Sequence, residues 1–187
     1  MDDSELAGSL LVAMPQLQDP NFRRTVVLLV EHDDNGTFGL VLNRPTDISV
    51  ASLCSSLEVE WAGEPNLEIQ WGGPVQPNTG WVVFNENLAL SGDEEGVAQL
   101  DEGLFFAGSL DVLKAIASTP PSDVIFFLGY AGWGPGQLES EMATGAWLVA
   151  PLSADTVFDV DHDEMWLHVV RGLGIDPATL VSTSGVH

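Results

Sequence analysis

The sequence predicts a single domain of the α/β (α+β) class, built on a mixed β-sheet with helices between some of its strands. Two observations predict this class. Short apolar runs rich in β-branched residues dominate the early part of the chain, and helical spacing interrupts them irregularly rather than after every strand. With 187 residues, 45% of them hydrophobic, the chain can bury one sizeable core but not two. We therefore expect one domain over residues 1–187.

The early part of the chain predicts strands. Leu10–Met14 is a short apolar run that ends at Pro15, because a residue before proline is pushed out of helical geometry. Thr25–Val30 is a continuous β-branched run, as expected of a strand that is buried on both faces. Thr37–Asn43 returns as a second strand after the Asn35-Gly36 dipeptide, which favours a tight turn. The sequence therefore predicts a β-hairpin here.

Helices and further strands follow. Apolar residues spaced three and four apart indicate a helix over Ser49–Leu57, which would turn Cys54 inward. Ser109 is a typical N-cap for a helix that runs to Ala117. One apolar stripe indicates a last helix: Trp166, Val169, Val170 and Leu173. An acidic turn is predicted over Asp93–Gly96. Further strands are predicted over Leu67–Trp71, Gly80–Phe84, Leu104–Ala107, Val124–Leu128 and Trp147–Ala150. A helix is predicted between the last two of these strands.

The charge balance excludes some partners. The chain carries 5 Lys+Arg against 28 Asp+Glu, a formal net charge of −23. Cationic side chains drive nucleic-acid binding, so DNA, RNA and anionic lipid should be repelled over most of this surface. A single lysine, Lys114, among so many carboxylates also resembles the surface of a halophilic protein, in which high salt screens self-repulsion.

The sequence also predicts a location. The chain opens with Met1-Asp2-Asp3, where a secretory peptide would carry positive charge, and its apolar runs are far shorter than the roughly 18 residues of a membrane span. A single cysteine excludes an internal disulfide, in agreement with a reducing compartment. We therefore expect a soluble, cytoplasmic protein without a membrane partner.

Most sequence motifs that are typical of enzymes are missing. The sequence has no phosphate-binding P-loop, no G-x-S-x-G elbow and no H-E-x-x-H pair, and one cysteine cannot form a thiolate zinc site. The acidic segment 159–164 lacks the glycine and terminal glutamate of a calcium loop. We expect no catalytic residues, no cofactor and no metal, although a catalytic site can also assemble from distant residues.

The glycine-rich stretch LGYAGWGPGQLESE, residues 128–141, allows two interpretations. Its glycines could let an anion approach the backbone at a helix start, with Tyr130 and Trp133 as flat contact surfaces. Alternatively, it is a strand-to-helix corner, in which Glu139 and Glu141 complement the helix dipole. Glu139 stands where a dinucleotide loop requires a small residue, so the structural interpretation is favoured.

Two further candidates lie near the N-terminus. Arg23, Arg24 and Arg44 could form a positive pocket for a carboxylate or phosphate, if the loop before Thr25 folds near the end of the second strand. Ion pairs with nearby carboxylates are the alternative. His32 could shuttle protons together with the carboxylate of Glu31. Alternatively, it is a polar residue at the turn, because adjacent residues on a strand point to opposite faces and the two side chains would then not touch.

Several motifs occur together in an order that resembles the bacterial YqgE/AlgH family. They are Met14-Pro15-x-Leu17-x-Asp19-Pro20-x-Phe22-x-Arg24, Val30-Glu31-His32, Gly39-Leu40-Val41-Leu42-Asn43-Arg44-Pro45, Trp71-Gly72-Gly73-Pro74-Val75 and the stretch 128–141. The resemblance covers nearly the whole chain, through Trp147 and the 166–176 tail. The chain ends in Gly185-Val186-His187 where the family often closes with Gly-His-Ala, so no role of that histidine carries over. The resemblance implies a mixed sheet bent into a pseudo-barrel with flanking helices.

The resemblance implies no established activity or catalytic residues, although some members carry the label of a transcriptional regulator. Our leading hypothesis is a non-catalytic binding or regulatory protein that acts on transcription, if at all, indirectly. Its partner would be another protein or a small anionic ligand. The alternative is a small-molecule sensor or enzyme with a pocket from the matched motifs: Asp19, Arg24, His32, Asn43, Arg44, Tyr130, Trp133 and Gln137. Direct DNA binding ranks third.

Overall fold

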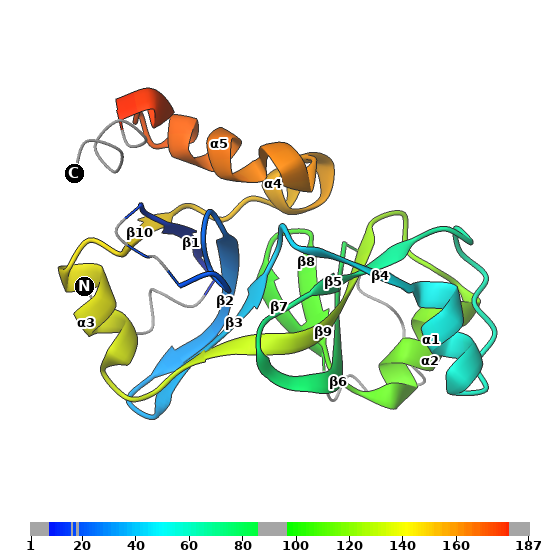
Figure 1. Cartoon of the computed structure of the whole chain (residues 1–187). Coiled ribbons are helices and arrows are strands. Elements are labelled where there is room, and N and C mark those ends of the chain that lie inside the picture. The colour runs from blue at the N-terminus through cyan, green and yellow to red at the C-terminus, as the bar shows by residue number, and fades with distance from the viewer. Residues whose placement is uncertain (1–7, 16, 18, 86–96, 180–187) are drawn as a thin grey trace.

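The computed structural model describes residues 8–15, 17, 19–85 and 97–179 (Figure 1). Within them lie ten strands: β1 (Leu10–Ala13), β2 (Val26–Asp33), β3 (Gly36–Val41), β4 (Pro45–Ser49), β5 (Glu68–Trp71), β6 (Val75–Phe84), β7 (Val97–Asp101), β8 (Leu104–Ala107), β9 (Val124–Trp133) and β10 (Trp147–Ala150). The helices of the same residues are α1 (Val50–Ser56), α2 (Leu110–Ser118), α3 (Gln137–Ala143), α4 (Ala154–Asp159) and α5 (His162–Gly172). None of these helices has the length and apolar character needed to cross a membrane.

The strands form one mixed sheet, as predicted. The order along it is β10-β1-β2-β3-β9-β6-β8-β7, and all neighbours in this order are antiparallel. Strands β4 and β5 form a side branch, in which β5 runs parallel to β9. The sheet is bent and encloses apolar side chains from β2, β6 and β8, such as Leu28, Val83 and Leu104. It does not close, since β10 and β7 are not paired within the described residues.

Strand β9 is shared by the two parts of the sheet. Residues 124–130 pair with β6 along one edge of β9, and residues 127–128 pair with β5. Further along, residues 131–133 pair with β3 instead. One strand of ten residues therefore joins the part of the sheet that contains β1 and β2 to the part that contains β6 and β8.

The loop after β5 crosses β9 backbone to backbone where the two parts join. The Gly72 N–H donates to the Leu128 carbonyl over 2.8 Å, and the Gly72 carbonyl accepts from the Val41 N–H over 2.9 Å. A Cβ atom on Gly73 would overlap the Tyr130 carbonyl. Glycines are required here because side chains would hold the two backbones apart.

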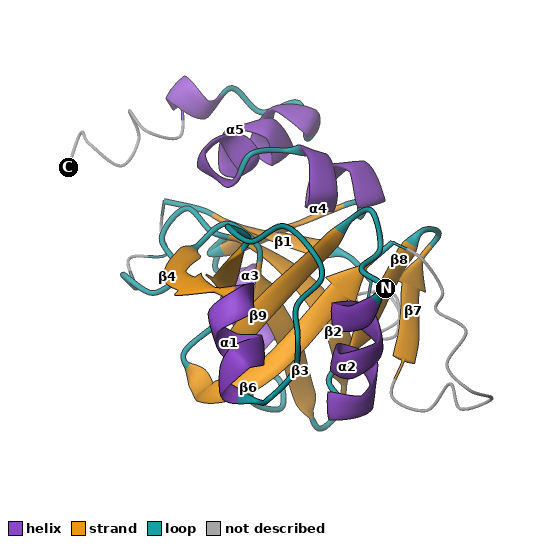
Figure 2. Cartoon of the chain, turned by 90° about the vertical axis from the view of Figure 1, so that its right-hand side faces the viewer, coloured by secondary structure: helices purple, strands orange, loops and turns teal. Residues whose placement is uncertain are grey.

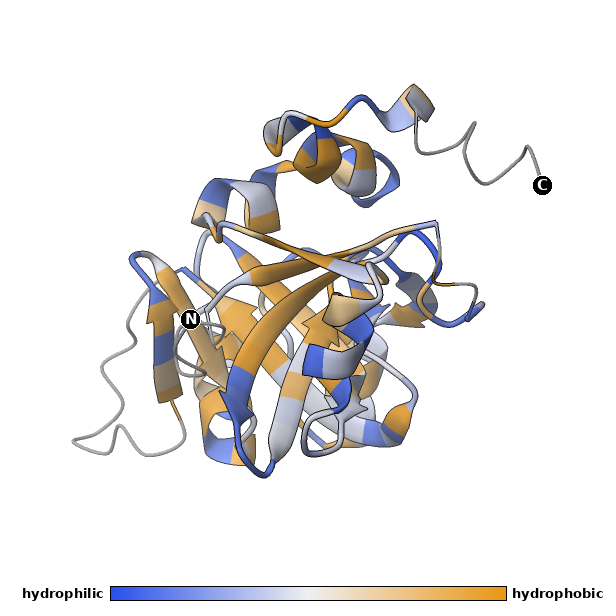
Figure 3. Cartoon of the chain, turned by 90° about the vertical axis from the view of Figure 1, so that its left-hand side faces the viewer, coloured by the Kyte–Doolittle hydropathy of each residue, from blue (hydrophilic) through white to orange (hydrophobic). Residues whose placement is uncertain are grey.

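Three apolar clusters hold the helices against the sheet. The cluster inside the bend is covered by α4 and α5, through Val157, Trp166 and Val170. A second cluster lies under α3 and includes Leu138 and Trp147. Figure 3 shows α3 in front of hydrophobic strand segments on that side. The third cluster packs α1 and α2 against β6 and β9.

Most predicted elements are present. The predicted hairpin is confirmed as β2–β3, and Cys54 is buried, as its helical position predicts. One prediction is wrong: the strand expected over 124–128 continues to Trp133, so the corner comes after the aromatic residues of the 128–141 stretch. Strands β4 and β7 and helix α4 were not predicted, and β6 begins five residues before Gly80. The predicted acidic turn over 93–96 and the Gly185–His187 terminus lie outside the described residues.

Candidate functional site

The loop between β1 and β2 lies against the junction of β3 and β4, and Asn43 fixes this contact. Its side-chain oxygen accepts from the Val26 N–H over 3.0 Å, and its amide nitrogen donates to the Arg24 carbonyl over 2.9 Å. Asn43 is buried, so both polar groups are satisfied by backbone. Asp19 shapes the same loop, because its carboxylate accepts from the Asn21 N–H over 2.9 Å.

This contact places the backbones of three arginines close together, and we call these residues the arginine cluster: Arg23, Arg24 and Arg44. The half-buried Arg44 guanidinium donates to the Arg23 carbonyl and, over 3.3 Å, to the Asn43 carbonyl. Burial lowers the pKa of the Arg44 guanidinium below its ordinary value. Arg24 has a left-handed backbone, with φ 57°, and its guanidinium lies 4.5 Å from the ring centre of Trp166 on α5.

Within the described residues, no carboxylate forms an ion pair with the arginine cluster. Across the described ranges, the ion pairs within 4.0 Å include only His32 with Glu139, so none of the three arginines is paired there. This is unexpected in a chain with 28 acidic residues and only five Lys and Arg. A guanidinium offers a fork of N–H donors that matches carboxylate and phosphate geometry. Unpaired guanidinium groups have the chemistry that an anionic ligand requires.

An aromatic group adjoins the arginine cluster. Phe22, one residue before Arg23, packs on three tryptophans, with centroid distances of 6.4 Å to Trp71, 6.1 Å to Trp133 and 5.8 Å to Trp147. These aromatic residues come from the β1–β2 loop and from the ends of β5 and β9 and the start of β10. Several matched motifs thus meet at one place in the fold.

Glu141 on α3 holds two tryptophans of this aromatic group through hydrogen bonds. Its carboxylate accepts from the Trp133 indole N–H over 3.1 Å and from the Trp147 indole N–H over 2.9 Å. It also accepts from the Gln137 amide over 2.9 Å, while the Gln137 oxygen accepts from the Gly134 N–H over 2.9 Å. Trp133 and Gln137 are therefore held by the protein itself at the β9–α3 corner.

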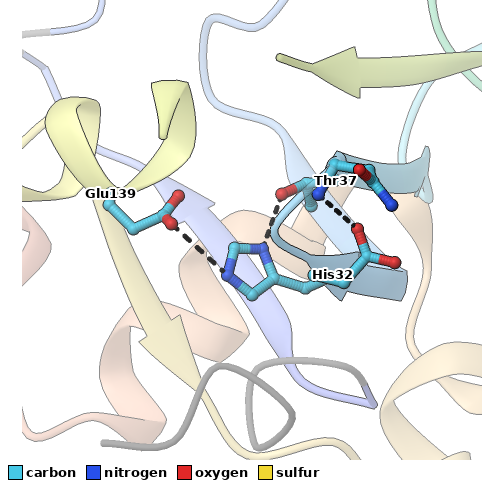
Figure 4. A network of polar contacts seen from close by, with 5 residues as sticks. His32, Thr37 and Glu139 are labelled. Atoms are coloured by element: carbon cyan, nitrogen blue, oxygen red, sulfur yellow. Dashed lines mark hydrogen bonds and ion pairs between the residues drawn. The ribbon is translucent and has the colours of Figure 1, made fainter. Parts of the chain in front are cut away.

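His32 lies beneath α3, with its side chain only 1% exposed. Its Nδ1 is 2.6 Å from the Thr37 hydroxyl oxygen, and its Nε2 is 3.8 Å from a carboxylate oxygen of Glu139 (Figure 4). That Nε2 makes no hydrogen bond with the described residues. A carboxylate facing Nε2 favours the tautomer with hydrogen there, in which Nδ1 accepts from Thr37.

Tyr130 faces away from the arginine cluster. Its ring stacks on Phe38, with centroids 4.6 Å apart, on the side of the sheet opposite α3. It borders an open cavity of about 460 Å³ that is also lined by the carboxylates of Glu31 and Asp33. These carboxylates would repel an anion, so this cavity and the arginine cluster differ in the ligands that they can take.

The eight predicted site residues are thus divided among different places. Asp19, Arg24, Asn43 and Arg44 gather around the β1–β2 loop, and His32 lies under α3. Trp133 and Gln137 belong to the Glu141 network, and Tyr130 stacks on Phe38, although Trp133 and Tyr130 both line the open cavity. Whether they bind a ligand stays a prediction. Sequence reasoning missed Glu141 as an acceptor, although its position four residues after Gln137 on a helix places the two side chains together.

The described residues contain no group of three or more His, Cys, Asp or Glu that could hold a metal ion. Burial raises the pKa of the Cys54 thiol, which keeps it in the unreactive protonated form.

Comparison with known proteins identifies relatives over nearly the whole chain. The model of a family described as AlgH-like matches residues 10–178. A UPF0301 protein of Anaeromyxobacter dehalogenans is 41% identical, over 96% of this chain and 94% of the relative, and one of Myxococcus xanthus is 39% identical, over 97% and 98%. The solution structure of the AlgH protein from Pseudomonas aeruginosa is 36% identical, with a TM-score of 0.76 over 94% of this chain and 93% of that chain. A crystal structure from Corynebacterium diphtheriae is 28% identical, with a TM-score of 0.72 over 92% and 90%.

Proposed function

The chain belongs to the AlgH-like family, and we propose that it is a cytoplasmic binding or regulatory protein without a catalytic site. In this proposal, it binds a small anionic ligand at its arginine cluster. The ligand would carry a carboxylate or phosphate group. Any effect on transcription would be indirect, because the net charge of −23 opposes contact with nucleic acid.

One observation carries this proposal. Three of the chain's five Lys and Arg residues meet at one contact, and none is paired with a carboxylate of the described residues. The buried Asn43 amide joins the loop to the first residue of β2 through two hydrogen bonds. A backbone contact that is already formed saves a ligand part of the cost of ordering its site.

The site favours a small ligand over a polyanion. Only three cations are gathered, and acidic residues dominate the rest of the chain. A long polyanion would have to lie along that acidic surface, whereas one carboxylate or phosphate group touches only the arginine cluster. Phe22 and Trp71 lie next to the cluster and offer apolar surface to the rest of such a ligand.

A thermal-shift and calorimetric titration would test the proposal, with orthophosphate, pyrophosphate and citrate as probes, followed by a library of anionic metabolites. We expect at least one anion to raise the melting temperature, and Arg23→Gln to weaken its binding by about ten-fold or more. Arg171→Gln on α5 is the matched control, since it removes one exposed cation outside the cluster. The proposal fails if no anion binds or if both variants weaken binding equally.

An enzyme is the second candidate, and the 2.6 Å contact between His32 and the Thr37 hydroxyl supports it. A screen of generic ester and phosphate-ester substrates would reveal such an activity. It should be lost in His32→Asn while the fold is retained. Direct DNA binding is the third candidate. An electrophoretic mobility shift of DNA by this protein at physiological salt would support it.

A further inference from the structure

An apolar groove lies between α1 and α2, and its lining includes none of the three arginines of the arginine cluster. We call it the α1–α2 groove; it holds a cavity of about 240 Å³, and Leu53, Leu57, Leu110, Leu113, Val82 and Phe126 are among its lining residues. Figure 2 shows the two helices side by side in front of β6 and β9. A dry engineered cavity of about 150 Å³ already accepts benzene, so this groove has room for one large apolar side chain.

The rim of the groove exposes leucines from both sides. Leu57, the C-cap of α1, is 42% exposed, and Leu110, the first residue of α2, is 50% exposed. The described residues include just one other large hydrophobic side chain that is this exposed, Ile48, which does not line the groove. Two exposed leucines that face one cavity are typical of a surface that another molecule covers.

The floor of the groove is open because it contains a glycine. Gly80 lines the groove on β6, and a Cβ atom placed there would meet a single atom within 4 Å, the Phe127 carbonyl oxygen at 3.8 Å. The backbone at Gly80 needs no left-handed conformation. A larger residue would therefore fit the strand and fill the groove, which provides a direct way to block it.

The segment after α1 holds the two sides of the groove together. It passes back toward α2, where the Ala62 N–H donates to the Ala117 carbonyl over 2.9 Å. Trp61 of the same segment packs edge-on against Phe126, with centroids 5.5 Å apart. Leu57 and Leu110 are the exposed large hydrophobic residues of the groove lining.

The charges next to the lining leucines favour one kind of occupant. Glu58 follows Leu57 and Asp111 follows Leu110, while Lys114, which follows Leu113, is the one basic residue of α1 and α2. A second copy of the chain or an anionic lipid surface would meet like charge, because each copy carries −23. A cationic segment would be attracted, and positive charge would steer its approach.

We propose that the α1–α2 groove binds a short cationic segment of a protein partner, which inserts one leucine-sized or aromatic side chain between Leu57 and Leu110. The apolar anchor supplies the specificity, and the flanking Lys or Arg residues of the partner face the carboxylates of the rim. This interaction is independent of anion binding at the arginine cluster.

Fluorescence anisotropy with labelled synthetic peptides would test the proposal. The probe is a short peptide of Lys, Ser and Gly with one central Phe, and its control has Ala in that position. At physiological salt, we expect the Phe peptide to bind at least about ten-fold more tightly than the Ala peptide. Gly80→Val and Leu110→Ala should remove this preference for Phe, because the first fills the groove and the second removes its rim.

Ile48→Ala is the matched control, since Ile48 is similarly exposed outside the groove. It should leave the preference unchanged, as should Arg23→Gln, which separates this result from any failure of the anion-binding proposal. Thermal melts of each variant confirm that it is folded. Equal binding of the two peptides, or equal losses in Ile48→Ala and Leu110→Ala, would overturn the proposal. So would equally tight binding of a Phe peptide in which Glu replaces each Lys.

Discussion

At the scale of single residues, Glu141 is the acceptor on which the β9–α3 corner depends. Glu141→Ala would leave the indole N–H groups of Trp133 and Trp147 without their partner. We expect the free energy of unfolding to fall by about 3 kcal/mol, because buried donors then lose a charged acceptor. Glu141→Gln keeps one oxygen and should lose about 1 kcal/mol. Urea unfolding would measure both changes.

Glu139→Gln is the control for Glu141. It changes a carboxylate on the same helix, but one that is 45% exposed and 3.8 Å from its partner. Such a contact contributes little, so the variant should lie within about 0.5 kcal/mol of the parent protein. Equal losses at positions 139 and 141 would show that the indole contacts are not what stabilises the corner.

Cys54 should make stability depend on pH in the alkaline range. Burial raises the pKa of its thiol in the folded protein, so the folded state holds this proton more tightly than the unfolded state does. The resulting stabilisation is complete below the ordinary thiol pKa of about 8.5 and is lost as pH rises through the raised value. Urea unfolding across this range should show a steeper decline for the parent protein than for Cys54→Ala.

A thiol reagent provides a second measurement for Cys54. The native protein should not react with it at about pH 8, and the thiol should become available when urea unfolds the chain. Stoichiometric labelling of the native protein would contradict the buried position.

The candidate site shows which residue properties a sequence can reveal. Proximity of Arg44 to the β1–β2 loop was predictable, because a hairpin brings the end of its second strand beside the start of its first. That no described carboxylate pairs with the arginines was not predictable, because it depends on where the side chains of the loop point. Tyr130 and Trp133 were grouped by sequence, yet Tyr130 stacks on Phe38 while Trp133 bonds to Glu141.

At the scale of elements, the crossing of the 72–73 loop over β9 should tolerate no side chain. Gly129 and Gly136 have nearly the same left-handed φ, 77° and 76°, but a Cβ atom on Gly129 would overlap the Gly73 carbonyl, whereas one on Gly136 would meet nothing within 4 Å. Gly136→Ala should therefore cost about 1–2 kcal/mol, and Gly129→Ala about 3 kcal/mol or more. Urea unfolding of this pair separates the contact from the backbone strain, and equal losses would contradict the crossing.

The same crossing explains why some element boundaries could not be predicted. Gly129 and Gly132 suggest a break after Leu128, but tertiary pairing with β3 carries β9 on to Trp133. In the same way, Pro74, Pro77 and Gly80 conceal the first half of β6. Continuous apolar runs such as β2 were predicted well, because burial on both faces leaves a pattern that needs no knowledge of the partner strands.

At the scale of the whole molecule, the net charge of −23 should make stability rise with salt. Carboxylates repel one another in the folded state, and the described part of the chain holds no Lys or Arg ion pair that added salt would weaken. Molar KCl reduces the screening length to about 3 Å and should raise the urea midpoint. Circular dichroism in low salt and in molar KCl would measure this, and an unchanged or lower midpoint would contradict it.

The position of β1 has a consequence for synthesis on the ribosome. Its residues are almost completely buried, and one of its edges is completed only by β10, where Leu10 pairs with Ala150 across 150 − 10 = 140 residues of chain. During translation, this apolar strand is made 140 residues before its second neighbour. The nascent chain therefore exposes an unpaired apolar strand edge over that interval, which favours aggregation and is the kind of surface that chaperones shield.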